Sequence, residues 1–355
     1  MRTKAPDPMI RVSVLVNTYN HEGFIAQAIQ SVLDQDFPAD QMEIIVVDDG
    51  STDATPQILQ RFLPRIRYIR KDNGGQISAF NTGVAEVRGA IVAFLDGDDW
   101  WPPSKLSAVA AAFEKNPDIT AVGHGFIRAR EETRAREPCI PAESYQLSLK
   151  NPDAARFAYS GRPFLSTSKL AVRKSVLRAA GRLPDNLIFF DVPIQLFAMA
   201  LGTAIILNQP LCFYRLHGEN LYETRHPDAK NLRRRYQFIS AQLDFLPDAL
   251  AAVGVSRETL AALFEADEIA CEQMRLVLEN GWPWETLNLE RRRFRFAYTQ
   301  HSASYRMFKS LVLASTLLMS PRRFYSLRDW YAARNLRRLR KPLGEPVPIP
   351  GIQLQ

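Results

Sequence analysis

The sequence predicts an α/β protein with a Rossmann-like, mostly parallel sheet flanked by helices, followed by a C-terminal α-helical region. In the first hundred residues, short apolar runs alternate with segments of helical spacing, as they do where crossover helices join parallel strands. Past about residue 225 no strand-like run is found, and residues 260–278 carry apolar side chains at three-and-four spacing, which is typical of amphipathic helices. The length of 355 residues suits about two domains.

The strands are predicted from apolar runs and the helices from the spacing between those runs. The runs lie at residues 12–17, 43–47, 66–69 and 91–95. Nearly continuous runs of this length indicate strands that are buried on both faces. Helices are expected where apolar residues recur three and four apart, at Phe24, Ile25, Ala28, Ile29, Val32 and Leu33, at Ile58, Leu59 and Phe62, and at Ile77 and Phe80.

The composition is that of an ordinary globular protein. With 46% hydrophobic and 23% charged residues, it excludes a disordered, collagen-like or disulfide-stapled chain. The 45 Lys and Arg exceed the 38 Asp and Glu, so the formal charge is +7, which favours an anionic partner. Cys139, Cys212 and Cys271 are widely spaced, which predicts reduced thiols and no zinc site.

The change in texture predicts a domain boundary near Glu223. It gives a first domain of residues 1–222, a helical region of residues 223–341 and an extended, proline-rich tail of residues 342–355. Neither a signal-peptide core nor a membrane-spanning run is found, so a cytoplasmic protein is expected. Residues 308–341 combine apolar, aromatic and arginine-rich segments. They fit peripheral contact with the inner face of the membrane, or equally a core helix followed by a solvated basic helix.

Polar residues follow each predicted strand, at residues 17–20, 48–53, 71–75 and 96–99. Because ligands bind at the carboxyl ends of the strands in sheets of this kind, these residues are expected to form one site. Asp96 and Asp98 make an acidic turn that suits Mg²⁺ or Mn²⁺, the alternative being a solvated surface turn. Asp49 can accept a hydrogen bond from a nucleotide base, while Ser51 or Thr52 is expected to cap the next helix.

Four ordered motifs carry a family resemblance. They are VSVLVNTYN at residues 12–20, IVVDDGSTD at residues 45–53, Asn73-Gly74-Gly75 with Asn81-Thr82-Gly83, and FLDGDD at residues 94–99. Together they resemble the family 2 glycosyltransferases with the GT-A fold. The resemblance continues through FDVPI at residues 190–194, where that family has its acidic catalytic motif, and through PLCFYRLH at residues 210–217. It covers about residues 10–220.

The resemblance implies an inverting, metal-dependent glycosyltransferase of the hexosyltransferase type. It would move a sugar from a nucleotide donor, most often a UDP-sugar, to a hydroxyl of a saccharide or lipid-linked acceptor in polysaccharide or glycoconjugate biosynthesis. By this resemblance Asp49 contacts the base, Asp96 the ribose and Asp98 the metal ion, Mg²⁺ or Mn²⁺. Asp191 is the general base. The other implied site residues are Asn17, Tyr19, Asn73, Gly75 and Arg215 for the donor, and His217 for the metal or the diphosphate.

Two residues depart from the family pattern. Phe190 stands where a Glu is usual, and Pro193 where another acidic residue is common. The alternative reading of Asp191 is therefore a helix N-cap. The alternative function is a non-catalytic nucleotide-sugar-binding protein of the same fold.

Other functions and other residues receive less support. A nicotinamide-dependent oxidoreductase is disfavoured because no Gly-x-Gly-x-x-Gly turn follows the first predicted strand. Nucleic-acid binding is disfavoured because no recognisable module is present. Trp100 or Trp101 is expected to stack on the sugar, whereas His21 and His124 are given no role.

Overall fold

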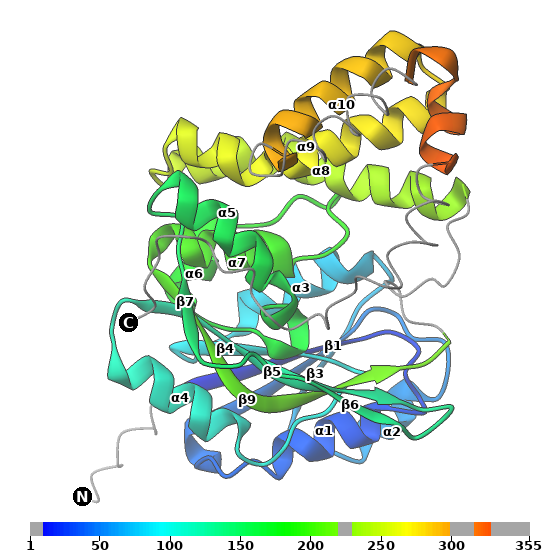
Figure 1. Ribbon diagram of the computed structural model, residues 1–355. Helices are drawn as coiled ribbons and strands as arrows, with labels where there is room; N and C mark the ends of the chain where they lie inside the picture. Colours follow the sequence, from blue (N-terminus) through cyan, green and yellow to red (C-terminus); the bar gives the residue numbers. More distant parts are fainter. Residues whose placement is uncertain (1–9, 219–228, 299–315, 328–355) are drawn as a thin grey trace, which may run out of the picture. The chain divides into compact units, whose positions relative to one another are not determined.

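The computed structural model describes residues 10–218, 229–298 and 316–327 (Figure 1). The chain divides into two compact units. Unit 1 comprises Met1–Asn220, Leu246–Ala262 and Gly344–Gln355, and unit 2 comprises Leu221–Phe245 and Leu263–Leu343. The predicted boundary near Glu223 and the predicted tail at residues 342–355 lie outside the described residues. The predicted domains 1–222 and 223–341 therefore stay predictions.

Unit 1 is built on a sheet that has nine strands within the described residues. Its parallel part has the order β3-β2-β1-β4, with β1 at Val12–Thr18, β2 at Met42–Asp48, β3 at Arg67–Arg70 and β4 at Ile91–Asp96. These are the four strands predicted from the sequence, which are confirmed. The register sets Asn17 beside Asp96 of β4, so the polar ends of these strands meet at one edge.

In the second half of the sheet, β5 (Ile119–Arg130) and β9 (Thr203–Leu216) run in the same direction as β4. They do so because β8 (Ala171–Arg173) is antiparallel to both β4 and β5, and β9 is parallel to β5. Strand β6 (Arg136–Cys139) pairs with β5, and β7 (Tyr145–Leu147) pairs with β9. Because β9 thus runs parallel to β4, the residues that end β9 reach the edge at which β4 ends.

Helices cover both faces of this sheet (Figure 1). On one face lie α1 (Ile25–Leu33), α2 (Thr55–Gln60) and α4 (Lys105–Lys115), which bury the β1 residues Val12, Val14 and Val16 in a common core. On the other face lie α3 (Gly75–Glu86), α6 (Lys174–Ala180) and α7 (Asp191–Leu201); α5 spans Pro152–Gly161. The three helices predicted from apolar spacing are confirmed as α1, α2 and α3.

The predicted cap of α2 is wrong. The helix begins at Thr55, and Asp53 Oδ1 accepts a hydrogen bond from its backbone N–H at 2.9 Å. Ser51 Oγ instead accepts a hydrogen bond from the backbone N–H of Asn20 at 2.9 Å, and the backbone N–H of Thr52 donates to Asn20 Oδ1 at 2.8 Å. These two residues therefore tie the loop after β2 to the loop after β1.

After residue 228 the described residues form helices, as the sequence predicts. They are α8 (Ala229–Ala252), α9 (Arg257–Glu279), α10 (Pro283–Tyr298) and a short helical segment at residues 316–327. Both α8 and α9 belong in part to each unit. In unit 2, the residues Ile269, Leu276, Leu289, Phe324 and Tyr325 form a buried core. Within the described part of the chain, every helix is too short or too polar to span a membrane.

Three packed aromatic rings attach the start of α7 to the sheet. Phe80 of α3, Phe94 of β4 and Phe190, the residue before α7, are fully buried. The Phe190 ring centroid lies 4.3 Å from that of Phe80 and 5.1 Å from that of Phe94. Phe190, which departs from the family pattern, thus fills the core directly beside Asp191.

We predict that Phe190→Ala lowers the free energy of unfolding by about 3–5 kcal/mol, because it removes a fully buried ring and leaves a cavity. Urea unfolding measures this loss. The matched control is Leu201→Ala at the other end of α7, where the side chain is 42% exposed, and its expected effect is within about 0.5 kcal/mol. A Phe190→Ala loss no larger than that of the control would contradict the packing role.

Candidate functional site

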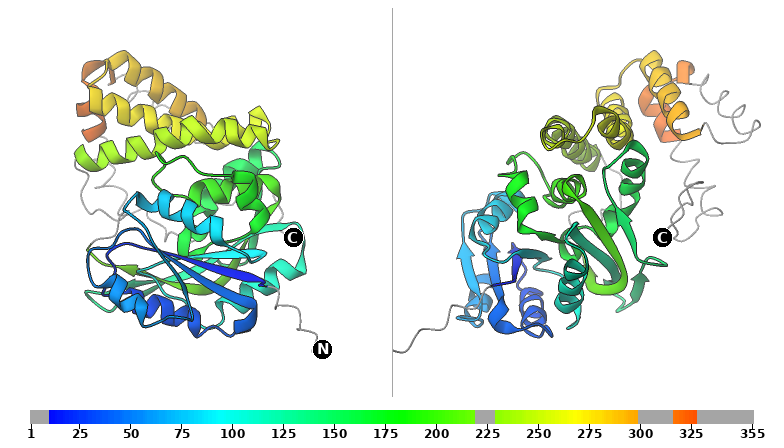
Figure 2. Two further views of the ribbon diagram at one scale, coloured as in Figure 1. Left: turned by 180° about the vertical axis from the view of Figure 1, so that it is seen from behind. Right: turned by 90° about the vertical axis from the view of Figure 1, so that its left-hand side faces the viewer.

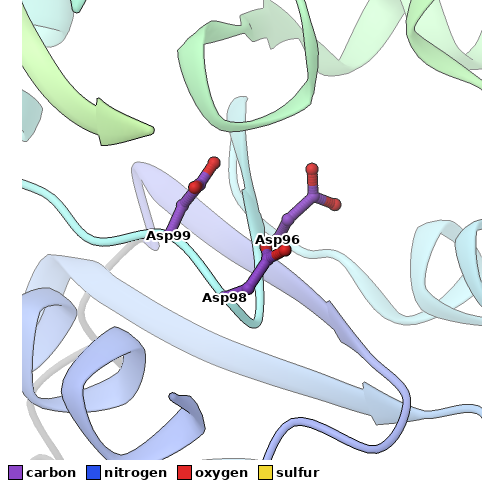
Figure 3. A group of neighbouring side chains, drawn as sticks. All are labelled: Asp96, Asp98 and Asp99. Carbon is purple, nitrogen blue, oxygen red and sulfur yellow. The ribbon is translucent and has the colours of Figure 1, made fainter. Parts of the chain in front are cut away.

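Three carboxylates stand on the turn that follows β4. The ligand atoms of Asp96, Asp98 and Asp99 lie within 4.8 Å of one another (Figure 3). Asp99 is buried, and Asp96 and Asp98 are half-buried. Oxygen donors gathered in this way fit a hard divalent cation such as Mg²⁺ or Mn²⁺.

The three carboxylates compete for ionisation. Burial raises the pKa of Asp96 well above its ordinary value, and the charges of Asp98, Asp99 and Asp191 raise it further. Burial and the charge of Asp98 likewise raise the pKa of Asp99. Lys169 opposes both shifts. A bound cation would relieve this repulsion, since opposite charge favours the ionised carboxylate.

Asp98 behaves differently from its neighbours. Burial acts to raise its pKa, but the hydrogen bond with His217 and the nearby His21 outweigh burial and lower that pKa. His217 Nε2 lies 3.1 Å from Asp98 Oδ2. The structure thus brings together the two predicted metal ligands, Asp98 and His217, from the ends of β4 and β9. It also places His21, which was given no role, beside them.

Arg215, near the end of β9, is hydrogen-bonded to the acidic turn. Its backbone N–H donates to Asp99 Oδ1 at 2.8 Å, and its Nε donates to the Asp98 carbonyl oxygen at 2.6 Å. Its Nη2 donates to Gln27 Oε1 at 2.6 Å, and its Nη1 pairs with Glu131. The side chain is therefore used to position the turn, and its contact with donor phosphate stays a prediction.

The two tryptophans that follow the acidic turn have different surroundings. Trp101 is 2% exposed, and its indole Nε1 donates to the Ser168 carbonyl oxygen at 2.9 Å, so it belongs to the core. Trp100 stacks on Phe213 with ring centroids 4.9 Å apart, and the Arg215 guanidinium lies 4.4 Å from its ring. Stacking of a sugar on Trp100 stays a prediction.

Asp49, at the end of β2, is bound to the loop that starts α3. Its carboxylate accepts hydrogen bonds from Lys71 Nζ at 2.7 Å, from the backbone N–H of Gly75 at 2.7 Å and from that of Gly74 at 3.0 Å. The same loop presents Asn73 and Gly75, both exposed. Asp49 therefore shapes the loop on which two predicted donor-binding residues stand, and its contact with a base stays a prediction.

The remaining predicted residues lie around the acidic turn. Asn17, 7% exposed, leaves its buried Oδ1 without a hydrogen-bond partner. Tyr19, two residues further along, is 44% exposed. Asp191 is the first residue of α7, and its Oδ1 accepts a hydrogen bond from the backbone N–H of Val192 at 2.8 Å. Burial raises the pKa of Asp191, although that hydrogen bond and Lys169 oppose the rise.

Sequence analysis missed the basic side chains beneath the turn. Lys169 is 4% exposed, with its Nζ 4.1 Å from the Phe126 ring centroid. Lys105 is fully buried, and its Nζ lies 2.9 Å from the Ser168 carbonyl oxygen and 2.7 Å from His124 Nε2. Lys105 stands four and eight residues before the apolar Val109 and Phe113, so helical spacing could have placed it on the buried face. For Lys169 the sequence offers no such signal.

Comparison with known proteins identifies the family. The family described as Glycosyl transferase family 2 matches residues 13–181. An uncharacterized glycosyltransferase of Nostoc sp. is 32% identical over 223 residues, which are 59% of this chain and 66% of that protein. The uncharacterized glycosyltransferase EpsJ of Bacillus subtilis is 30% identical over 235 residues, 64% of this chain and 67% of EpsJ. This chain belongs to glycosyltransferase family 2. The matched stretches span about two thirds of these relatives' own lengths.

A third relative is TarS of Staphylococcus aureus, a poly(ribitol-phosphate) β-N-acetylglucosaminyltransferase. It is 33% identical over 112 residues, 30% of this chain and 20% of TarS. The crystal structure of TarS residues 1–349 in complex with UDP-GlcNAc superposes with a TM-score of 0.50 and 20% identity, covering 81% of this chain and 88% of that one. The predicted GT-A fold is thereby confirmed.

We predict that Lys105 makes stability depend on pH. Burial and the charge of Lys169 lower the pKa of Lys105 to about 7, whereas in the unfolded chain it is about 10.4. Between about pH 7 and 8.5 unfolding therefore takes up a proton, and the free energy of unfolding rises with pH by up to about 1.4 kcal/mol per unit. Urea unfolding across this range measures the slope.

Lys105→Met should remove this slope. Lys115→Met, an exposed position on the same helix, should keep it. The comparison stops at about pH 8.5 because unfolded cysteines ionise above that value. Equal slopes in the wild type and in Lys105→Met would show that Lys105 keeps its proton in the folded protein.

Proposed function

We propose that this chain is an inverting, metal-dependent glycosyltransferase that uses a nucleoside-diphosphate sugar, with UDP as the nucleotide. The observation that carries the proposal is the desolvated carboxylate turn after β4, set beside Asn17, Asp191 and His217 in a family 2 chain. The relative TarS, whose solved structure holds UDP-GlcNAc, supports UDP as the nucleotide.

The donor set fits a divalent cation. In this proposal Asp98 and His217 hold the ion, Mg²⁺ or Mn²⁺, with Asp96 nearby. The ion would neutralise the charge that develops on the departing diphosphate. His217 fits this role because its ring is fixed, with its centroid 4.9 Å from that of Phe24, while its Nε2 points at Asp98 Oδ2.

Asp191 is the proposed general base. The acceptor hydroxyl attacks the anomeric carbon opposite the diphosphate, a new C–O bond forms, the bond to the diphosphate breaks, and the hydroxyl proton passes to the Asp191 carboxylate. Two observations support this role. The side chain stands at the start of α7, close enough to the turn for its charge to raise the pKa of Asp96. Burial also raises the pKa of Asp191 itself, and this makes it a stronger base.

The donor is proposed to lie along the edge formed by β1, β2 and β4. The exposed Tyr19, Asn73 and Gly75 are the groups that a donor can reach. Asn17, whose buried Oδ1 has no hydrogen-bond partner, belongs to the same proposed set. Asp49, Asp96 and Arg215 complete the proposed donor set. We further propose that the sugar is a hexose, that the acceptor belongs to a polysaccharide or glycoconjugate, and that the reaction takes place in the cytoplasm. The relative TarS, a poly(ribitol-phosphate) β-N-acetylglucosaminyltransferase, supports such an acceptor.

A non-catalytic nucleotide-sugar-binding protein is the second candidate. It is favoured by Phe190, which leaves Asp191 without the acidic neighbour that the family usually has, and by the hydrogen bond from Val192 to Asp191. Both candidates bind the donor, and only the enzyme transfers the sugar.

We expect UDP, and not GDP, dTDP or CDP, to raise the melting temperature, and to do so only with Mn²⁺ or Mg²⁺. At a hundred times Kd, binding adds about 2.7 kcal/mol of stability, which corresponds to a rise of several degrees. Thermal unfolding with each nucleotide, with and without the metal, makes the measurement. A protein that no nucleotide stabilises would exclude both candidates.

For Asp98→Asn we expect the UDP affinity of the variant with Mn²⁺ to equal that of the wild type with chelator, because the amide keeps the shape but loses the charge. Isothermal titration measures both affinities. The matched control is Asp72→Asn, an exposed carboxylate in the loop before α3, which should bind like the wild type. Full Mn²⁺-dependent affinity in Asp98→Asn would remove Asp98 from the metal site.

For Asp191→Asn we expect unchanged UDP binding and a kcat lower by about 10²–10⁴-fold, since only proton transfer is lost. Transfer from UDP-sugars, with Asp185→Asn as an exposed control, tests this. A near-normal kcat would rule out Asp191 as the base. A wild type that binds UDP but neither transfers nor hydrolyses any UDP-sugar would favour the non-catalytic candidate.

A further inference from the structure

Unit 2 exposes large apolar side chains in two segments. Trp282 and Trp284, at the connection between α9 and α10, are 69% and 57% exposed. In the segment at residues 316–327, Leu317, Leu318 and Leu327 are 52%, 84% and 53% exposed. These five residues are called the apolar set below. Single exposed apolar residues are common, but several on neighbouring segments indicate a surface that contacts a partner.

The two segments lie side by side at one end of unit 2 (Figures 1 and 2). Phe324 and Tyr325 join them, because both are buried against Leu276 of α9 and Leu289 of α10. Of the two alternatives that the sequence left open for residues 308–341, membrane contact or a core helix, these two aromatics follow the second, since they form the core. The exposed side of the segment at residues 316–327 carries Leu327, Arg322 and Arg323.

The charge of the chain is concentrated in the same unit. The residues of unit 2 include 20 Lys and Arg against 11 Asp and Glu, and the rest of the chain has 25 against 27. The formal charges are therefore +9 and −2. At this end of α9 and the start of α10, Glu272, Glu279 and Glu285 all contact the one Arg275.

We propose that this end of unit 2 binds an anionic phospholipid surface. The apolar set enters the boundary between headgroups and acyl chains, where tryptophan and leucine are favoured, and Arg322 and Arg323 contact lipid phosphates. A soluble polyanion would complement the charge but would leave the apolar set in water. A second copy of the chain would set two units of +9 against each other. The proposal goes beyond the nucleotide site and does not depend on it.

The test is co-sedimentation of the full chain with vesicles of phosphatidylcholine alone or of phosphatidylcholine with phosphatidylglycerol. At about 0.1 M salt, where charges are screened beyond about 10 Å, we expect binding to the anionic vesicles and about tenfold weaker binding, or none, to the neutral ones. Leu318→Ser with Trp282→Ser should weaken anionic binding by about tenfold or more. Arg322→Gln with Arg323→Gln should weaken it as well.

The control is Leu63→Ser with Leu201→Ser, which removes two leucines of unit 1 that are 44% and 42% exposed. It should bind vesicles like the wild type. Thermal stabilisation by UDP and Mn²⁺, followed in every variant, reports the nucleotide site separately, so either proposal can fail alone.

Three outcomes would overturn the lipid proposal. The first is equal binding to both vesicle types or to neither. In the second, Leu318→Ser with Trp282→Ser leaves vesicle binding unchanged, and inorganic polyphosphate abolishes it. That result would indicate that the surface binds a soluble polyanion. The third is a dimer, seen by light scattering, that Leu318→Ser with Trp282→Ser dissociates in a protein that does not bind vesicles.

Discussion

The mutual repulsion of desolvated carboxylates after β4 is the constraint on which the rest of unit 1 depends. Asp96, Asp98 and Asp99 stand on one turn, and burial withholds from them the water that would screen their charges. Such a turn is stable only if cations and hydrogen-bond donors surround it. In the described structure Lys169 supplies positive charge, His217 makes a hydrogen bond with Asp98, and Arg215 supplies both charge and hydrogen bonds.

The groups that stabilise this turn come from the second half of the sheet. Ser168 Oγ accepts a hydrogen bond from the backbone N–H of Asp96 at 3.1 Å, and its carbonyl oxygen is held by Lys105 and Trp101. Arg215 arrives on β9, which the two antiparallel pairings of β8 bring back parallel to β4. The first hundred residues thus supply the negative charge and residues 168–217 supply most of what balances it.

The sequence predicts the strands and helices that depend on local periodicity. It does not predict the side-chain partners that come from distant parts of the chain. The four parallel strands and the first three helices follow from apolar spacing, and strand direction then gathers the polar ends at one edge. The predicted cap at Ser51 or Thr52 was wrong because both residues bond to Asn20, about thirty residues earlier in the chain. The Ser51 hydroxyl accepts from the Asn20 backbone N–H, and the Thr52 backbone N–H donates to the Asn20 side chain. For residues 308–341 the sequence left membrane contact and a core helix equally open, and it is the packing of Phe324 and Tyr325 against α9 and α10 that decides for the core there. Asp49 and Arg215 have protein partners that no short segment reveals, and their contacts with the donor stay predictions.

Phe190 limits how much charge this site can hold. The family pattern would put a Glu at this position, but here the side chain is fully buried between Phe80 and Phe94. A carboxylate in that apolar space would be unpaired and would add to the charges that already raise the pKa of Asp96. The aromatic residue therefore removes one negative charge from the edge of the site and fixes the start of α7 by packing instead. Asp191, the general base that we propose, stands next to this packed ring, and burial raises its pKa.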